Sequence, residues 1–408
     1  MNIEELFAGV GLVIDDQVFE TGNDKIKDIV EDIESRHIPL AKYNYVPQID
    51  AKQCKRMSFV LLDWELVSLE NENGEPIPGA EAVKETEIDK LINLIASIVD
   101  NCYIPVFIFS NTASEDIVKK LEDAKILTDG NNLPFFIESK SSIVTADGSQ
   151  LWTKIESWVK QNPSIYVCKV WQNTACDAEI NLLKELSISN NWPKILWETS
   201  SLDGVDPSEE MADVLNQNLF ARMQPLKFDA EIIASSTIGD PTMDEIQGVL
   251  QAQRYTTIID KETSMTGDFY KCSGGKYYLN IRPSCDCVER EGSSGMVYLL
   301  RADKMKPEEV RDCFNSKYGN FKEQSNNAIV GPLHDNCYFK FKFQTLRICD
   351  AQQIKEKKIG RVLPPFLTHI TEKYGLYIQR QGLPRLPKKA VLTDEQIAAE
   401  ESPKDDSV

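Results

Sequence analysis

The stretch SFVLLD, residues 58–63, is an apolar run that ends in a single carboxylate. Such a run between polar residues is typical of a strand buried on both faces of a sheet. Two similar runs occur along the chain, GLVIDD at residues 11–16 and PVFIFS at residues 105–110. Because helical spacing of apolar residues separates them, the pattern predicts a parallel sheet covered by helices on both faces.

The same alternation extends through the first 160 residues. Two more runs, a weaker one from Leu40 to Val46 and LPFFIESK at residues 133–140, bring the predicted strands to five. Five strands alternating with helices predict an α/β fold with a flavodoxin-like, doubly wound parallel sheet. Amphipathic patterns predict the connecting helices at residues 23–37, 85–100, 114–127 and 148–161.

The rest of the chain has a different pattern. Helical spacing dominates after the predicted sheet, and strand-like segments with turn glycines follow from Tyr255. The C-terminal end is acidic and lacks aromatic residues, so we expect it to be disordered. The predicted segments are the sheet domain at 1–162, a helical connector at 163–254, a β-rich (α+β) domain at 255–350, a closing helix with a basic stretch at 351–390, and an acidic tail at 391–408.

The negative charge is concentrated in two parts of the chain. The protein has a net charge of −19, of which residues 1–150 carry −15 and residues 394–408 carry −5, whereas residues 151–393 carry +1. Phosphate backbones and anionic lipid surfaces attract basic proteins. The charge therefore argues against binding of nucleic acid or a membrane by the whole protein.

The cysteines and the apolar runs predict a cytoplasmic protein. The N-terminal residues have no basic segment followed by a long apolar run, and no stretch reaches the roughly 20 apolar residues of a spanning helix. The ten cysteines are scattered, which is typical of reduced thiols. Cys272, Cys285 and Cys287 lie near turn glycines, but they lack a second zinc-binding pair. Buried thiols are favoured there, and metal binding is left open.

Polar residues stand where the predicted strands end. In a parallel sheet these ends meet at one edge, where binding sites form. Clustered carboxylates repel each other, and Mg²⁺, which prefers oxygen ligands, removes that repulsion. An aspartate there can also act as a nucleophile towards phosphorus, while a lysine and a hydroxyl stabilise the phosphoryl oxygens. The residues at these ends are Asp15, Asp16, Asp63, Ser110 and Lys140.

These residues, in this order, resemble the receiver domain of response regulators over residues 8–162. The resemblance implies Mg²⁺ as the cofactor and an aspartyl phosphate as the modified state. It implies no enzyme activity beyond the receiver's own phosphorylation and dephosphorylation. It assigns Asp63 as the phosphoacceptor, Ser110 and Lys140 as contacts of the phosphoryl group, and Asp15, Asp16, Asp63 and the backbone carbonyl of Glu65 as metal ligands.

Three features depart from the receiver pattern. An acidic insertion occupies residues 67–85, and Ser141 follows Lys140 where the family has proline. The family's aromatic switch position is Ile137, next to Phe136. We therefore expect the phosphorylation chemistry to be retained, whereas readout through an aromatic side chain is left open.

The whole chain is similar to the regulator component of Detocs-type anti-phage systems. The similarity rests on a receiver joined to a β-rich domain that ends RVLPPFLTHITEKYGLYIQRQGLPRLP, residues 361–387, without effector-enzyme motifs. It implies a sensor histidine kinase as partner and a receiver-containing effector as a second candidate. The implied role is a phosphate-accepting buffer of the signal. The oligomeric state is left open, with a homodimer among the alternatives.

Two other functions fit parts of the pattern. In one, the receiver-like fold is not phosphorylated and acts as an interaction adaptor, but such a domain has no reason to keep Asp15, Asp63 and Lys140 together. In the other, the chain is a phosphate-ester hydrolase with an aspartate nucleophile. That class places a second aspartate two residues after the nucleophile, where this chain has Gln17 and Glu65. The hydrolase is therefore disfavoured.

Overall fold

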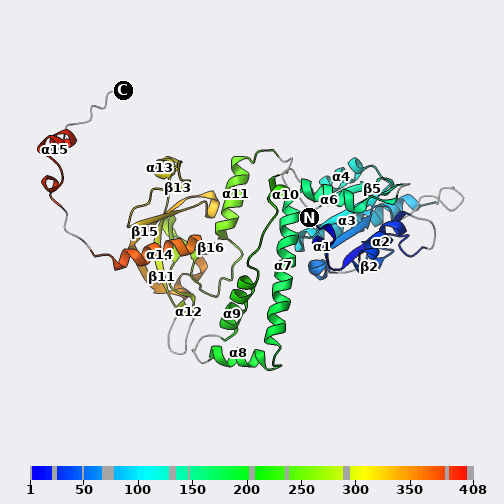
Figure 1. Ribbon diagram of the computed structural model, residues 1–408, viewed down its shortest axis with the longest axis horizontal. Coiled ribbons are helices and arrows are strands. Elements are labelled where there is room, and N and C mark those ends of the chain that lie inside the picture. The colour runs from blue at the N-terminus through cyan, green and yellow to red at the C-terminus, as the bar shows by residue number, and fades with distance from the viewer. Residues whose placement is uncertain are drawn as a thin grey trace. The chain divides into compact units, whose positions relative to one another are not determined.

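The run SFVLLD forms strand β3 (Phe59–Asp63), the central strand of a five-stranded parallel sheet. The strand order is β2-β1-β3-β4-β5, with every neighbouring pair parallel. This order is consistent with a flavodoxin-like fold and confirms the predicted α/β class (Figure 1). The other strands are β1 (Gly11–Ile14), β2 (Leu40–Tyr43), β4 (Val106–Ser110) and β5 (Phe135–Ser139).

The structure, a computed structural model, places the chain in two compact units. The first unit comprises residues 1–195 and 212–239, and the second comprises residues 196–211 and 240–408. The residues that the structure describes are 2–20, 25–47, 50–66, 78–127, 135–145, 148–201, 207–234, 239–287, 295–381 and 386–401.

Helices connect the strands of the first unit. The predicted helices at 85–100, 114–127 and 148–161 are observed with shifted ends. Of the acidic insertion at 67–85, residues 67–77 lie outside the described residues and residues 80–85 belong to the first helical turns of α3. A short hairpin of β6 (Val144–Thr145) and β7 (Gly148–Ser149) follows β5. The helices are α1 (Ile3–Leu6), α2 (Lys25–Ser35), α3 (Ala80–Asn101), α4 (Ser114–Asp123), α5 (Lys140–Ile143), α6 (Leu151–Gln161), α7 (Pro163–Leu186) and α10 (Ala230–Ala234). Two further helices, α8 (Trp192–Ser201) and α9 (Pro207–Arg222), contain residues of both units.

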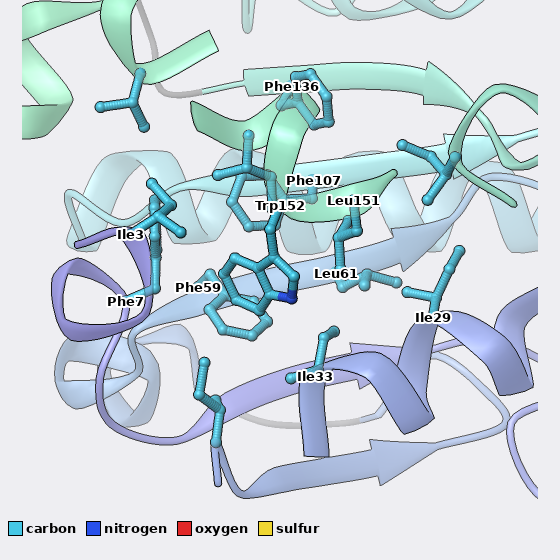
Figure 2. Packing of buried hydrophobic residues seen from close by; sticks show 14 of the residues in the cluster. Ile3, Phe7, Ile29, Ile33, Phe59, Leu61, Phe107, Phe136, Leu151 and Trp152 are labelled. Carbon is cyan, nitrogen blue, oxygen red and sulfur yellow. The ribbon is translucent and has the colours of Figure 1, made fainter. Parts of the chain in front are cut away.

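Alternate residues of the strands fill two separate cores. Side chains of β3 alternate between the faces, so that Phe59 and Leu61 enter one core while Val60 and Leu62 enter the other. The first core packs against α1, α2, α6 and α7, and Figure 2 shows Trp152 of α6 over Phe59 beside Ile33 of α2. The second core packs against α3 and α4. Burial of both faces explains why these strands are continuous apolar runs.

Helix α7 is part of the first unit and carries Lys169, whose side chain is buried. Ile165 and Tyr166 of this helix belong to the first core. Lys169 is only 4% exposed, and its ammonium donates a hydrogen bond to the Ser58 carbonyl and lies 5.8 Å from the centre of the Phe7 ring. Burial lowers the pKa of Lys169 to about 8, because desolvation disfavours the charged form.

We expect Lys169→Met to stabilise the protein at pH 7. In the unfolded chain this lysine has its ordinary pKa of about 10.4, so the unfolded state binds more protons between pH 8 and pH 10. Stability of the native protein therefore rises with pH across that window. The substitution removes the free-energy cost of burying a charged group, but it also removes one hydrogen bond. The free energy of unfolding therefore rises by about 1–2 kcal/mol at pH 7.

Urea denaturation at pH 7 and at pH 10 tests this expectation. The stability difference between Lys169→Met and the native protein shrinks at pH 10, where the native lysine is neutral. Lys184→Met, at an exposed position of the same helix, is the matched control and shows neither effect. A Lys169→Met protein that is less stable than the native one at pH 7 contradicts the expectation.

An antiparallel sheet of seven strands organises the second unit. The strand order is β14-β15-β11-β10-β9-β16-β8, and helix α14 (Phe366–Gln379) covers one face with Ile370 buried in the core (Figure 1). The predicted β-rich region is thereby confirmed. The strands are β8 (Tyr255–Thr256), β9 (Asp268–Cys272), β10 (Lys276–Asn280), β11 (Met296–Lys304), β14 (Asn327–Val330), β15 (Phe339–Asp350) and β16 (Lys358–Val362), with a small separate pair, β12 (Phe314–Asn315) and β13 (Asn320–Phe321).

Strand β16 extends this sheet beyond residue 350, into the segment expected to hold only the closing helix and a basic stretch. It inserts between β9 and β8 and carries Lys358 and Arg361. Both bind the fully buried carboxylate of Asp268, at 3.1 Å from Lys358 Nζ and 2.8 Å from Arg361 Nε. This buried ion cluster connects β16 to β9 and has a structural role in the sheet.

The second unit contains further helices besides α14. Expected disorder after residue 391 is replaced by a helix at 394–401, while residues 402–408 lie outside the described residues. The helices are α11 (Met243–Arg254), α12 (Ser284–Cys287), α13 (Pro307–Cys313) and α15 (Asp394–Glu401).

Candidate functional site

Two buried aspartates lie side by side at the carboxyl edge of the parallel sheet. Asp63 is the last residue of β3, and Asp15 directly follows β1. The register pairs Ile14 with Leu62, which places the two aspartates at the same level on neighbouring strands. Asp15 is 0% exposed and Asp63 is 4% exposed. Ionised carboxylates with so little contact with water need a compensating positive charge.

Lys140 supplies that charge. It begins α5 directly after β5, and its side chain is also buried. Its ammonium lies 2.8 Å from Asp15 Oδ2 and 2.8 Å from Asp63 Oδ2, so it bridges the two carboxylates. The other oxygen of each aspartate accepts a backbone N–H two residues on, from Gln17 at 2.9 Å and from Glu65 at 3.0 Å. These contacts fix the orientation of both carboxylates.

Asp16 completes a group that fits a divalent cation. Its half-buried carboxylate joins those of Asp15 and Asp63, with one ligand oxygen from each lying within 4.8 Å of the others. Mg²⁺ prefers carboxylate oxygens, and these three side chains would hold it. With Lys140 included, three ionised carboxylates leave a net charge of −2, which one Mg²⁺ neutralises. The donor set therefore fits a hard dication.

The burial of this group shifts its pKa values. Desolvation raises the pKa of Asp63 to about 7; Lys140 opposes this shift, whereas Asp15 adds to it. Desolvation likewise raises the pKa of Asp16, with a further contribution from the Asp15 charge. Burial acts to lower the pKa of Lys140, but attraction to Asp63 and Asp15 outweighs it and raises this pKa above its usual value. The lysine thus stays charged, and a metal ion favours the ionised form of Asp63.

The side chain of Glu65 belongs to a second polar network next to the aspartates. Its Oε1 atom accepts hydrogen bonds from Lys84 of α3 at 2.7 Å and from the Thr112 hydroxyl at 2.8 Å. Burial acts to raise the pKa of Glu65, but these hydrogen bonds outweigh it and lower the pKa. The sequence predicted only a role for the Glu65 backbone. It contained no signal for Lys84 or Thr112, because their contacts depend on long-range packing.

Ser110 is fully buried at the end of β4, on the strand next to β3. The register pairs Asp63 with Phe109, so Ser110 lies one residue beyond the partner of Asp63. Its hydroxyl accepts the backbone N–H of Thr112 at 3.0 Å. Through Thr112, Ser110 is connected to the Glu65 network.

The residues near the aromatic switch position face opposite cores. Phe136 packs edge-on against Phe107 and Phe109 in the first core. Ile137 is half-buried against the second core. The Phe136 ring therefore packs on the face away from Ile137, while Phe135 packs against the same core as Ile137.

Asp15, Asp16 and Asp63 form the one group of potential metal ligands among the residues that the structure describes. The Cys287 thiol is buried and accepts a hydrogen bond from the Asn280 amide at 3.2 Å, while Cys272 is half-buried. The side chain of Cys285 lies outside the described residues. The described thiols therefore fit packing and hydrogen bonding.

No protein-family model matches the chain, and no curated protein matches its sequence. Among the described residues, every helix is too short or too polar to cross a membrane. The resemblance to receiver domains therefore stays a prediction from the sequence.

Proposed function

We propose that the chain is a phospho-accepting signalling protein that takes a phosphoryl group onto Asp63. The observation that carries the proposal is the bridge of Lys140 between Asp15 and Asp63, beside a third carboxylate at one sheet edge. An acidic cluster that is exposed to water does not need a compensating charge from a buried lysine. Here the lysine directly follows β5, which lies two strands away from β3 in the sheet. A site that accepts a dianionic group needs both a metal and a fixed cation.

The chemistry follows from the positions of these groups. An Asp63 carboxylate oxygen attacks phosphorus, the bond from phosphorus to a histidine nitrogen of the donor breaks, and the leaving imidazole takes up a proton. Asp15, Asp16 and Asp63 would hold Mg²⁺, which when bound supplies positive charge to the transferring oxygens. Lys140 stays charged and offers its ammonium to the new phosphoryl group. Ser110, on the next strand, can donate its hydroxyl proton, because its oxygen only accepts in the hydrogen bond from the Thr112 N–H.

We propose that phosphorylation of Asp63 changes the contacts of Thr112 and, through them, those of Glu65. A shift of Ser110 towards a phosphoryl group would displace Thr112, whose N–H donates to the Ser110 hydroxyl and whose own hydroxyl donates to Glu65. Glu65, which also accepts from Lys84 of α3, would then lose one of its two side-chain partners. This route replaces an aromatic switch, because Phe136 is packed in the core and residue 137 is isoleucine.

The cellular role in this proposal is that of the regulator of a Detocs-type defence system in the cytoplasm. Support comes from the resemblance in sequence and from the acidic site. A sensor histidine kinase would be the donor, and a receiver-containing effector would compete for the same phosphate. The protein would then lower the phosphate flow that reaches the effector.

We expect the full-length protein to gain one phosphoryl group on incubation with acetyl phosphate and Mg²⁺. Intact-mass spectrometry detects this gain, and chelation of the metal or Asp63→Asn abolishes it, because the metal site or the nucleophile is lost. Asp123→Asn, at an exposed position of α4, is the matched control and labels normally. Equal labelling of Asp63→Asn and the native protein overturns the assignment. Failure of the native protein to label with acetyl phosphate and with its kinase favours the adaptor function.

A further inference from the structure

A basic pocket of about 400 Å³ lies on the face of the second unit's sheet opposite the core that contains Ile370. Five cations line it against two carboxylates, Asp303 and Glu309, which gives a net charge of +3. Residues 151–393 together carry only +1, so the pocket concentrates positive charge within a nearly neutral part of the chain. The cations are Arg301, Lys304, Lys306, Lys340 and Lys342.

Side chains alternate between the two faces along β15, which places Lys340 and Lys342 on the face of the pocket. Phe339, Phe341 and Phe343 point into the core, while the alternating residues Lys340 and Lys342 point to the opposite face. The register sets Lys342 directly opposite Arg301 of β11. Like charges in this position destabilise a sheet. Asp303, two residues along β11 and opposite Lys340 in the register, supplies the negative charge that offsets this repulsion.

Asp303 holds two of the cations in place. Its carboxylate accepts Arg301 Nε at 2.6 Å and Lys342 Nζ at 2.5 Å. The Arg301 guanidinium also lies 5.9 Å from the centre of the Tyr278 ring. Even so, the Lys342 side chain remains 50% exposed and that of Arg301 29% exposed, so both cations can reach a ligand. Preorganised cations bind an anion at a lower entropic cost.

We propose that this pocket binds an oligophosphate, the chain of linked phosphates found in free triphosphate and in nucleoside triphosphates. The volume suits a small ligand, and a charge of +3 matches several phosphate groups rather than one. The pocket lining has no exposed aromatic ring, and Tyr278 is only 9% exposed. Binding of single-stranded nucleic acid uses such rings to stack bases, so the lining favours the phosphate chain itself.

Isothermal titration calorimetry of the metal-free full-length protein with sodium triphosphate tests this proposal. We expect one site that weakens as salt increases, with ATP binding about as tightly as triphosphate, because the described lining offers no aromatic ring on which a base could stack. Loss of two charge-assisted contacts in K340Q/K342Q weakens binding about tenfold or more. The matched control K388Q/K389Q removes the same charge at exposed positions outside the pocket and binds normally.

Two further variants and two competing ligands make the result decisive. K340Q alone leaves the Asp303 network intact and still weakens binding, which separates ligand contact from a folding defect. Asp63→Asn retains triphosphate binding, so this site stands or falls independently of the phosphorylation site. Absence of binding by the native protein, equal affinity of K340Q/K342Q and the native protein, or preference for a single-stranded oligonucleotide or an anionic vesicle overturns the proposal.

Discussion

Lys140→Met is expected to destabilise the first unit by about 3–5 kcal/mol, the largest stability loss that we predict for a single substitution. The change preserves most of the side-chain volume but removes the cation that lies 2.8 Å from both Asp15 and Asp63. Two buried carboxylates then face each other without a shared counter-ion. For a domain of this size the loss corresponds to a drop of roughly 10 °C in melting temperature.

A double-mutant cycle measured by urea denaturation checks this prediction. Asp63→Asn in the Lys140→Met background restores part of the stability, because it removes one of the two repelling charges. Added Mg²⁺ also stabilises Lys140→Met, since the ion takes over the role of the lost cation. Lys119→Met, at an exposed position of α4, serves as the control and changes stability little. A Lys140→Met protein as stable as the native one contradicts the observed bridge.

Asp63→Asn is expected to stabilise the metal-free protein by a few kcal/mol at pH 8. Burial raises the pKa of Asp63 to about 7, whereas in the unfolded chain an aspartate has a pKa of about 3.9. Between these values the native state binds more protons than the unfolded state. The native protein therefore loses stability as the pH rises from about 4 to about 7, and the variant lacks this loss.

Thermal denaturation in the presence of a chelator at pH 5 and pH 8 measures this effect. The advantage of Asp63→Asn is largest at pH 8 and shrinks at pH 5, where the native carboxyl is mostly protonated. Mg²⁺ then closes the gap at pH 8, because it stabilises the native protein more than the variant. Asp123→Asn again provides the control. A variant less stable than the native protein at pH 8 means that Asp63 contributes to folding rather than being kept at a cost in stability.

The parallel sheet and its acidic edge were predictable from local sequence. Strands β1, β3 and β4 are short apolar runs buried on both faces, and parallel topology alone brings their ends together. Asp15 and Asp63 could therefore be placed before any contact was known. Lys140 was predicted at the same edge as a contact of the phosphoryl group, whereas its bridge between Asp15 and Asp63 appears only in the structure.

Other parts could not be predicted, since long-range contacts decide them. Strand β16 contains Lys358 and Arg361, and its charges are acceptable in a sheet only because Asp268 is buried beside them. The sequence pattern predicts the first half of α7 as part of a connector, yet Ile165 and Tyr166 complete the first core. Lys84 and Thr112 carry no motif, and only packing brings them to Glu65.

Location of the phosphoryl group within the labelled protein tests the central claim most directly. An aspartyl phosphate is an acyl phosphate, which borohydride reduces to homoserine, so peptide mass spectrometry after reduction identifies the modified aspartate. We expect reduction at Asp63 in the protein labelled with Mg²⁺ present, and none in the protein labelled with a chelator. Reduction at Asp15 or Asp16, or a stable phosphate ester on a serine or threonine, contradicts it.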